Sequence, residues 1–397
     1  MKKKILTSAL LISLLAGGTV CLTPVYAAKM TFKQKKELKL LNTASAAFDM
    51  KLYDMSIEYL NKAIEINPLN AETYTKRANA KYLKGDYKEA IKDYTTALEI
   101  DPNRENTYYN RGIAKANLKA YDEVIEDYTK ELEVNPQNIN AYLNRGTTEV
   151  LINKYNEAIE DFSKVIEIDN TNETAYYNRG IAKRYNNDPK GAIEDYSKVI
   201  ELNPNSIEAY NNRGVAKYYL KDYKGAIEDY SKVIELNKNF KRAYYNRGLA
   251  KLGMQKYEDA ILDFTKEIEV NPKNDLAYYD RGLAATKLDH YVSAIDDYTK
   301  AIEINPTNAN YYADRGELIY RSNGDLKKAQ EDLTKAIELD AEDPENYLTR
   351  AMIFCKLKMY LAAIDDLNIV LKKDEKNTQA YDLRSYAIQS LNSQKTE

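Results

Sequence analysis

The sequence is poor in the residues that most enzymes and metalloproteins use. Its 397 residues include one histidine, two cysteines and no tryptophan. No histidine pair or cysteine–histidine cluster has the spacing of a metal site. The glycines at the expected helix contacts stand singly, so no phosphate-binding loop is indicated. His290 is expected in a turn, where a solvated or capping role is far commoner than general-base catalysis. The sequence predicts no catalytic, cofactor or metal site.

The chain also lacks a basic excess and a flexible linker. Its formal net charge is -3, with charges of both signs interspersed, so nothing resembles the basic stripe of a nucleic-acid-binding protein. Nine prolines, 14 glycines and no low-complexity tract leave no room for an interdomain linker. We therefore expect no nucleic-acid partner and a single elongated domain.

The first residues are of a different kind. Lys2 to Lys4 precede an apolar run from Ile5 to about Leu22, and the run ends at Val25-Tyr26-Ala27, which suits signal peptidase. Residues 1–27 are therefore predicted to be a signal peptide, and the protein is expected to be exported to a periplasmic, cell-surface or extracellular site. The alternative is an uncleaved anchor, which would confine membrane contact to this segment.

Export and the cysteine count together limit the redox chemistry of the chain. Cys21 leaves with the signal, so Cys355 is the only thiol of the mature chain and no internal disulfide can form. Cys355 lies in an apolar segment and is expected to be a small buried side chain.

What the chain does contain is an arginine followed by a small residue, returning every 34 residues. The glycines of this pair are Gly112, Gly146, Gly180, Gly214, Gly248, Gly282 and Gly316. A fixed period in this range is typical of a solenoid. The predicted organisation is a short basic lead-in at 28–36, ten units over 37–377, and a capping helix with a short tail at 378–397. The units begin at Glu37, Ala71, Glu105, Ile139, Glu173, Ile207, Lys241, Asp275, Ala309 and Pro344.

Each unit reads as two helices, called A and B, separated by a polar break at unit positions 15 and 16. Small residues occupy position 8 in helix A and position 20 in helix B, whereas position 24 is usually tyrosine or phenylalanine. Small and large side chains at fixed offsets allow stacked helices to interdigitate. Six of the nine prolines stand at position 32, between one unit and the next.

These residues resemble the tetratricopeptide repeat, which has the same length, the same small residues at positions 8 and 20, an aromatic residue at 24 and proline at 32. The resemblance covers Glu37 to about Leu391. It implies an all-α fold, a right-handed superhelical solenoid of antiparallel helix pairs. The chain departs from the family pattern at Glu131 and Glu267, which stand at position 27 in place of a small residue; we expect these carboxylates to be paired or at the rim, with looser packing around them.

An arginine at position 7 accompanies an aspartate at position 23. Nine units have both residues, and the first unit, with Thr43 and Tyr59, has neither. Joint presence and absence indicate contact, and we interpret the pairs as a semi-buried structural ladder. Positions 7 and 23 lie at similar heights both within a hairpin and between B and the following A, so the sequence leaves the pairing open.

The resemblance also implies a binding groove lined by positions 2, 5, 6, 9, 12 and 13 of helix A, which fall on one side of a helix. Asparagine recurs at position 6, and its amide can donate to and accept from an extended backbone. Tyr185, Tyr218 and Tyr219 fall on the same strip. The predicted partner-binding residues are Tyr109, Asn110, Ile113, Asn144, Tyr177, Asn178, Ile181, Asn212, Val215, Arg242, Tyr245, Asn246, Leu249, Tyr279 and Asp280. For any one of them, contact with a neighbouring unit is an equally good interpretation.

The predicted function is that of a non-enzymatic, exported scaffold that holds an extended or helical segment of a partner protein, with no cofactor. A clamp for a terminal carboxylate is disfavoured, because the lysines and arginines that such a clamp needs are absent from most units. Two alternatives stay open: a binder of glycan or cell-envelope polymer, since tyrosine and asparagine also suit sugars, and an enzyme of unknown type.

Overall fold

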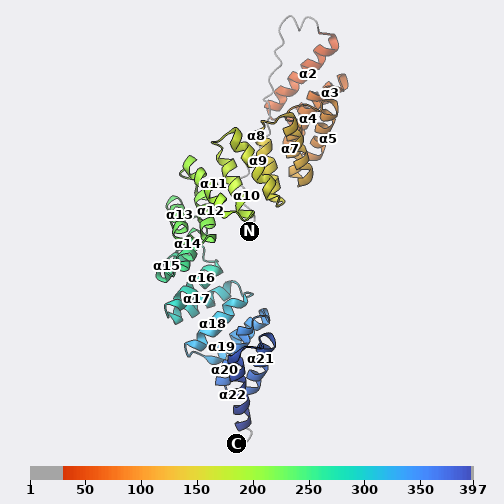
Figure 1. Ribbon diagram of the computed structural model, residues 1–397. Coiled ribbons are helices and arrows are strands. Elements are labelled where there is room, and N and C mark those ends of the chain that lie inside the picture. Colours follow the sequence, from red (N-terminus) through yellow and green to blue (C-terminus); the bar gives the residue numbers. More distant parts are fainter. Residues whose placement is uncertain (1–29, 395–397) are drawn as a thin grey trace. The chain divides into compact units, whose positions relative to one another are not determined.

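The computed structural model describes residues 30–394, which form 21 α-helices and contain no strand (Figure 1). The all-α architecture predicted from the sequence is confirmed. The proposed signal segment at 1–27, with Cys21, lies outside the described residues, so signal cleavage and export stay predictions.

Helices A and B alternate along the chain. The A helices are α2 (Phe32–Asp49), α4 (Ala71–Lys84), α6 (Thr107–Asn117), α8 (Ile139–Leu151), α10 (Glu173–Tyr185), α12 (Ile207–Tyr219), α14 (Ala243–Gly253), α16 (Asp275–Lys287), α18 (Ala309–Arg321), α20 (Pro344–Lys356) and α22 (Thr378–Gln394). The B helices are α3 (Tyr53–Ile66), α5 (Tyr87–Ile100), α7 (Tyr121–Val134), α9 (Tyr155–Ile168), α11 (Pro189–Leu202), α13 (Tyr223–Leu236), α15 (Tyr257–Val270), α17 (Tyr291–Ile304), α19 (Leu326–Leu339) and α21 (Tyr360–Lys373).

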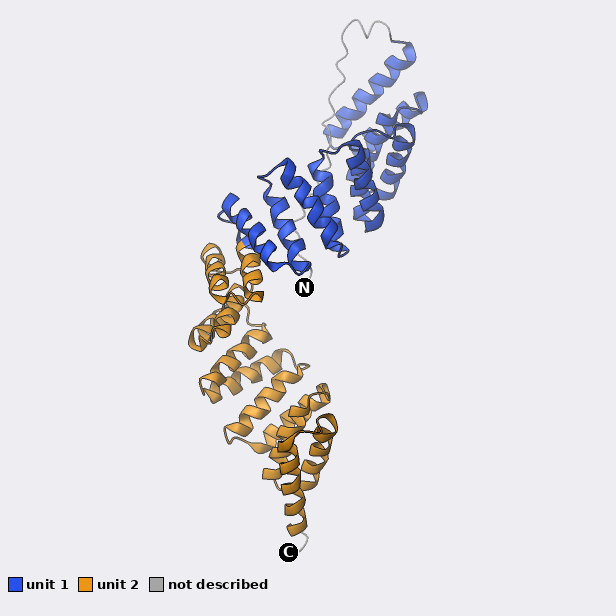
Figure 2. Cartoon of the chain, in the orientation of Figure 1, with its two compact units in different colours: residues 1–209 blue, residues 210–397 orange. Residues whose placement is uncertain are grey.

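The chain forms two compact units, residues 1–209 and 210–397 (Figure 2). The first, unit 1, holds the helices from α2 to α11, and the second, unit 2, holds those from α13 to α22. Within each, every helix packs against the next one along the chain, as α4 does against α5 and α5 against α6. This is the packing expected of stacked hairpins, in which a repeat contacts only its neighbours.

The turn between A and B always uses a left-handed residue at position 15. This residue is Gly85 in one hairpin, with φ of 90°, and in the other nine it is a residue with a side chain, such as Lys221 with φ of 60°. A side chain in this conformation costs free energy because its Cβ crowds the following carbonyl. The turn therefore carries a repeated small strain.

Replacing Lys221 by glycine is expected to raise the free energy of unfolding by about 0.5–1 kcal/mol, because glycine adopts positive φ without steric cost. Gly85→Ala should lower it by a similar amount. A Cβ at Gly85 would meet no atom within 4 Å, so that loss would report backbone conformation alone. Urea denaturation followed by circular dichroism checks both. Equal stability of Lys221→Gly and wild type would contradict the strain.

The predicted contact between small and large residues is present within the hairpins. A Cβ placed on Gly112 would lie 2.8 Å from the ring of Tyr128, and one on Gly248 would lie 2.7 Å from the ring of Phe264. The rings of both Tyr128 and Phe264 are buried. Position 8 is therefore small because the aromatic ring at position 24 lies directly against the backbone of helix A.

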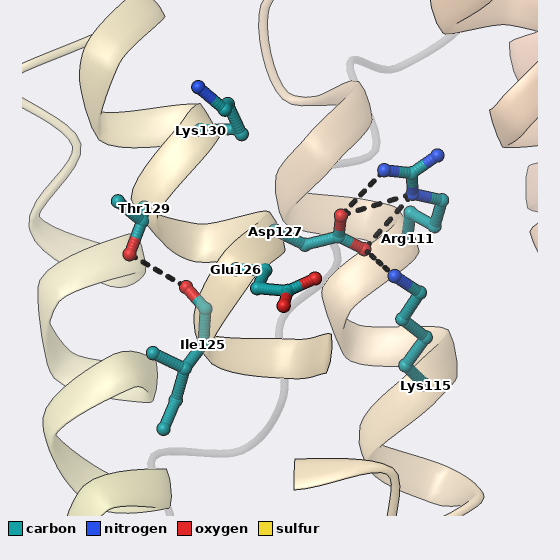
Figure 3. A pocket seen from close by; sticks show the side chains of 7 residues that line it. All are labelled: Arg111, Lys115, Ile125, Glu126, Asp127, Thr129 and Lys130. Atoms are coloured by element: carbon teal, nitrogen blue, oxygen red, sulfur yellow. Dashed lines mark hydrogen bonds and ion pairs between the residues drawn. The ribbon is translucent and has the colours of Figure 1, made fainter. Parts of the chain in front are cut away.

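The arginine–aspartate pairs form within each hairpin, which settles the pairing that the sequence left open. Arg111 donates from Nε and Nη2 to the Asp127 carboxylate, at 3.0 and 2.6 Å, and Figure 3 shows Lys115 reaching the same carboxylate. The nine pairs are Arg77–Asp93, Arg111–Asp127, Arg145–Asp161, Arg179–Asp195, Arg213–Asp229, Arg247–Asp263, Arg281–Asp297, Arg315–Asp332 and Arg350–Asp366.

Most of the ladder arginines also reach the preceding helix B. Arg111 Nη1 donates to the Thr95 hydroxyl on the preceding helix B at 3.0 Å, and its guanidinium lies 5.5 Å from the centre of the Tyr108 ring. Arg247 contacts Ser231 and Tyr244 in the same way. One side chain thus holds together its own hairpin and the helix before it.

The structure corrects one expectation about the start of the stack. The lead-in at 28–36 was predicted to precede the first helix, but α2 begins at Phe32. Thr31 caps α2: its hydroxyl accepts from the Gln34 N–H at 3.2 Å, while the Gln34 side chain accepts from the Thr31 N–H at 2.9 Å. This reciprocal pair is a capping box, which starts the helix five residues before the predicted repeat.

Glu131 and Glu267 are fully buried and do not lie at the rim. Glu131 accepts hydrogen bonds from the N–H groups of Asn106 and Tyr109 and from the side chain of Asn138. It is therefore paired, which is one of the two arrangements expected from the sequence. Both glutamates belong to units whose helix A starts two residues late, at Thr107 and Ala243. Glu131 serves there as the acceptor for the free N–H groups at the start of α6.

Candidate functional site

The candidate site is the helix-A face, which we define as positions 2, 5, 6, 9, 12 and 13 of the A helices. Tyrosine at position 5 bonds to position 6 of the next helix A. The Asn144 side-chain amide donates to the Tyr109 hydroxyl at 3.0 Å, and in unit 2 Tyr245 donates to Asp280 Oδ2 at 2.7 Å. Tyr279 repeats the contact with Asp314 at 2.6 Å. The side chains at positions 5 and 6 therefore form a polar row, which is fixed by hydrogen bonds between successive hairpins.

Within unit 2, the side chain at position 6 of this row changes from asparagine, at Asn246, to aspartate, at Asp280 and Asp314. Burial raises the pKa of Asp280 to about 6, although the hydroxyl of Tyr245 stabilises its charged form. Burial likewise raises the pKa of Asp314. Glu317, at position 9 of the same helix as Asp314, is exposed. The helix-A face of unit 2 thus carries acids, and Asp280 changes its charge near pH 6.

The structure buries seven of the predicted partner-binding side chains, which leaves them little surface for a partner, and their role in binding stays a prediction. They are Tyr109, Asn110, Ile113, Tyr177, Asn178, Ile181 and Tyr245. The three tyrosines among them stand at position 5, which packs inward against the aromatic ring at position 24. The ring centres of Tyr109 and Tyr128 are 5.7 Å apart, and those of Tyr245 and Phe264 are 5.8 Å apart.

The other predicted residues keep some access to solvent. Asn144, Asn212, Val215, Asn246, Leu249, Tyr279 and Asp280 are half-buried, and Arg242 is exposed. Position 13 carries the most accessible aromatic rings of the face. Tyr185 in unit 1 is 37% exposed and lies under Arg184, and Tyr219 in unit 2 is 69% exposed. These side chains are the part of the face that a partner can reach.

A pocket on α6 and α7 is lined by the ladder residues Arg111, Lys115 and Asp127 and by Lys130 (Figure 3). Arg111 and Lys115 are both held by Asp127, and Lys130 pairs with Glu133 at 2.7 Å. The three cations of this pocket are therefore paired with acids of the same hairpin.

One buried acid, Glu149, was not identified from the sequence. Glu149, at position 11 of α8, is 5% exposed, and its Oε2 has no hydrogen-bond partner among the described residues. Burial, together with the charge of Asp161, raises its pKa to about 8. In five other 34-residue repeats the residue at position 11 is lysine, so Glu149 departs from a pattern that the sequence shows.

The structure also shows where the cysteine and the histidine of the described residues lie. Cys355 is a buried thiol, as predicted, and burial raises its pKa. His290 is exposed at the start of α17 and its side chain makes no capping bond. Residues 30–394 contain no group of three or more histidine, cysteine or acidic side chains arranged to hold a metal ion. Among the described helices, none has the length and apolar character needed to cross a membrane.

Comparison with known families gives matches to four models of one repeat. Models described as tetratricopeptide repeat match residues 174–206, 207–240 and 276–308, residues 59–92 and 297–331, and residues 40–68 and 241–274. A further model, described as TPR repeat, matches 78–119 and 149–185. Together they cover most of the chain. No curated protein matches the sequence.

Solved structures with similar folds are also repeat proteins. MamA is 32% identical over 42% of this chain and 91% of its own, with a TM-score of 0.41. YrrB, described as a TPR protein with an unusual peptide-binding site, is 24% identical over 46% of this chain and 94% of its own, with a TM-score of 0.41. Yeast Tom70 is 20% identical over 91% of this chain and 89% of its own, with a TM-score of 0.38.

Proposed function

Because this chain belongs to the tetratricopeptide repeat family, we propose that it is an exported, non-enzymatic scaffold that binds a segment of a partner protein on its helix-A face. The observation that carries this proposal is the bonded row at positions 5 and 6. Tyr109 with Asn144, and Tyr245 with Asp280, hold polar groups half-exposed in a fixed arrangement. A surface that is ordered before binding loses little conformational entropy when a ligand arrives.

The accessible side chains favour a peptide ligand over a small molecule. Tyr185 and Tyr219 offer aromatic area with few rotatable bonds, and Asn144 and Asn246 offer amides that can pair with a backbone. The acids of unit 2, Asp280 among them, favour a segment with lysine or arginine there. Glycan or envelope polymer is the second candidate function, since exposed tyrosine rings also stack on sugars. Nothing in the described residues specifically favours an enzyme.

Export is part of the proposal and rests on the sequence of residues 1–27. Fractionation of producing cells, with mass determination of the mature chain, tests it. We expect a chain that starts at Ala28. Recovery of the uncut chain from the membrane fraction would support the anchor instead, and recovery from the cytoplasm would contradict export.

The binding proposal is tested by affinity capture with the full mature chain. A variant with Tyr185→Ala, Tyr219→Ala and Arg242→Ala is expected to lose at least about tenfold in capture of protein ligand, because these are exposed aromatic and cationic side chains of the face. The matched control, Leu262→Ala with Val292→Ala, removes exposed apolar side chains of helix B, which are 64% and 78% exposed. Equal capture by both variants would contradict the helix-A face, and retention of envelope polymer alone would favour the second candidate.

A further inference from the structure

Helix α22 ends the described stack and repeats the arginine pattern incompletely. Arg384 stands at position 7. Its Nη1 donates to Asn368 on the preceding helix B at 2.9 Å, and its guanidinium lies 5.2 Å from the centre of the Tyr381 ring. These are two of the three contacts that the ladder arginines make. The third, a carboxylate from the following helix B, has no counterpart here, because no such helix follows α22 among the described residues.

The surface beside Arg384 is one that helix B covers elsewhere. At position 11, Ile319 and Phe354 are 4% and 7% exposed, whereas Ile388 is 43% exposed. At position 8, Ala351 is fully buried, whereas Ser385 is exposed. The opposite face of α22 packs on α21 through Ala380 and Ala387, which are both fully buried. Positions 7, 8 and 11 of α22 thus form an uncovered face, which we call the terminal face.

The hairpins of this same chain show what fits such a face. Asp366 reaches Arg350 from α21 with oxygens at 2.8 Å from both Nε and Nη2, and Leu367 lies beside it in the core. Ala44 and Ala351 stand opposite leucine and Ala78 stands opposite tyrosine, and a Cβ on Gly282 would lie 2.7 Å from the ring of Tyr298. A Cβ pushes the partner side chain outward, so Ser385 suits leucine better than tyrosine.

We propose that the terminal face binds an amphipathic helix of a partner protein that carries the sequence pattern Ala-x-x-Asp-Leu, docked as a helix B supplied by another chain. The aspartate pairs with both free edges of the Arg384 guanidinium, the leucine lies over Ser385, and the alanine permits close approach near Ile388. The pairing is the same fork-to-fork contact that the nine ladder arginines make, and it gives the docked helix one register.

Charge complementarity sets the chemistry of the partner. A neutral helix would cover part of the Arg384 guanidinium without compensating its charge, which is costly, whereas an aspartate at this place replaces the lost water. The inference does not depend on the helix-A face, and the side chains that it uses are separate from that face. Failure of one proposal therefore leaves the other standing.

The test uses the full chain and a synthetic helix of defined sequence. The probe is a peptide with the sequence of α21, Tyr360–Lys373, in which Asn368 is replaced by aspartate and joined to Lys372 by a lactam that holds the helix; both positions face solvent in α21. A matched peptide carries Asp366→Asn. Titration calorimetry is expected to show saturable binding of the first peptide and binding at least about tenfold weaker for the second.

Two protein variants complete the cycle. Arg384→Gln should weaken the aspartate peptide by the same factor and bind both peptides alike, because the charge pair is already absent. Ser385→Tyr fills the space that the peptide residue Leu367 would occupy, so it should abolish binding of either peptide. Because Ser385 is exposed, the change leaves the fold intact. No saturable binding to the wild type, equal affinity for the two peptides, or unchanged binding by Arg384→Gln would overturn the proposal.

Discussion

Replacing Arg281 by leucine is expected to lower the free energy of unfolding by about 3–5 kcal/mol, the usual loss when one member of a buried ion pair is removed. Arg281 is the only cation paired with Asp297 in the described residues; its Nε and Nη2 lie 2.9 and 2.6 Å from the carboxylate. Asp297 is 6% exposed, so water cannot replace the guanidinium. Position 11 of this hairpin is Ala285, which offers no charge.

A matched hairpin supplies the control. Asp263 accepts from Arg247 and pairs also with Lys251 at 2.8 Å. Arg247→Leu therefore leaves a charge on Asp263 that is still compensated, and we expect a loss smaller by about 1–2 kcal/mol than for Arg281→Leu. Urea denaturation gives the difference, and hydrogen exchange in α15 and α17 locates it. Equal losses in the two variants would show that the lysine contributes nothing, and no loss in either would contradict the ladder as a stabilising element.

The second large effect is expected at Glu149. Its pKa in the folded chain is raised to about 8, mainly by burial and then by the charge of Asp161, while Arg145 and Lys154 oppose the shift. A group whose folded pKa lies above its unfolded pKa stabilises the fold at low pH. Its contribution is complete below the ordinary glutamate value and is lost as the pH rises through about 8. The wild-type chain should therefore lose stability across this window.

Glu149→Gln is expected to match the wild type near pH 4 and to exceed it by about 2–4 kcal/mol at pH 9, because the neutral amide has no proton to lose. Glu149→Lys should be more stable again at pH 7, since lysine at position 11 pairs with the aspartate at position 23 in five other hairpins. Other titrating groups, Asp280 included, are common to all three proteins and cancel in the difference.

Glu157→Gln is the control for Glu149. Glu157 is exposed and also acts on Glu149 through its charge, but it is not itself buried. Its replacement should leave the pH dependence nearly unchanged. The measurement is of denaturation midpoints from pH 4 to pH 9. Parallel curves for wild type and Glu149→Gln would mean that the pKa of Glu149 is the same in the folded and unfolded chain.

The sequence predicted the helices well and the helix-A face less well, for one physical reason. Periodicity fixes which residues share one side of a helix, and this is why the breaks at position 15 and the small residues at position 8 were found. It does not fix how deeply the neighbouring elements cover that side. Tyr109 and Asn144 both fall on the strip predicted to bind a partner. The ring of Tyr109 lies against Tyr128, while Asn144 stays half-exposed.

The same limit applies to the ladder. Joint occurrence of arginine and aspartate indicated contact, but the choice between Asp127 and the aspartate of a neighbouring hairpin for Arg111 needed the packing geometry. Glu149 is the opposite case. Five lysines at position 11 made it an outlier in the printed sequence, and a comparison of each position with the same position in the other units would have found it.

The bond from each ladder arginine to the preceding helix B has a consequence for the length of the protein. Arg145 meets Thr129, Arg179 meets Ser163 and Arg281 meets Thr265, so the acceptor in these hairpins is a short hydroxyl side chain, whereas Arg77 meets the amide of Asn61. A hairpin can therefore follow many others in the series without losing its partner. Loss or duplication of a hairpin of this kind by recombination would leave the next arginine supplied with a hydroxyl, so the number of such hairpins can change during evolution while the junction stays the same.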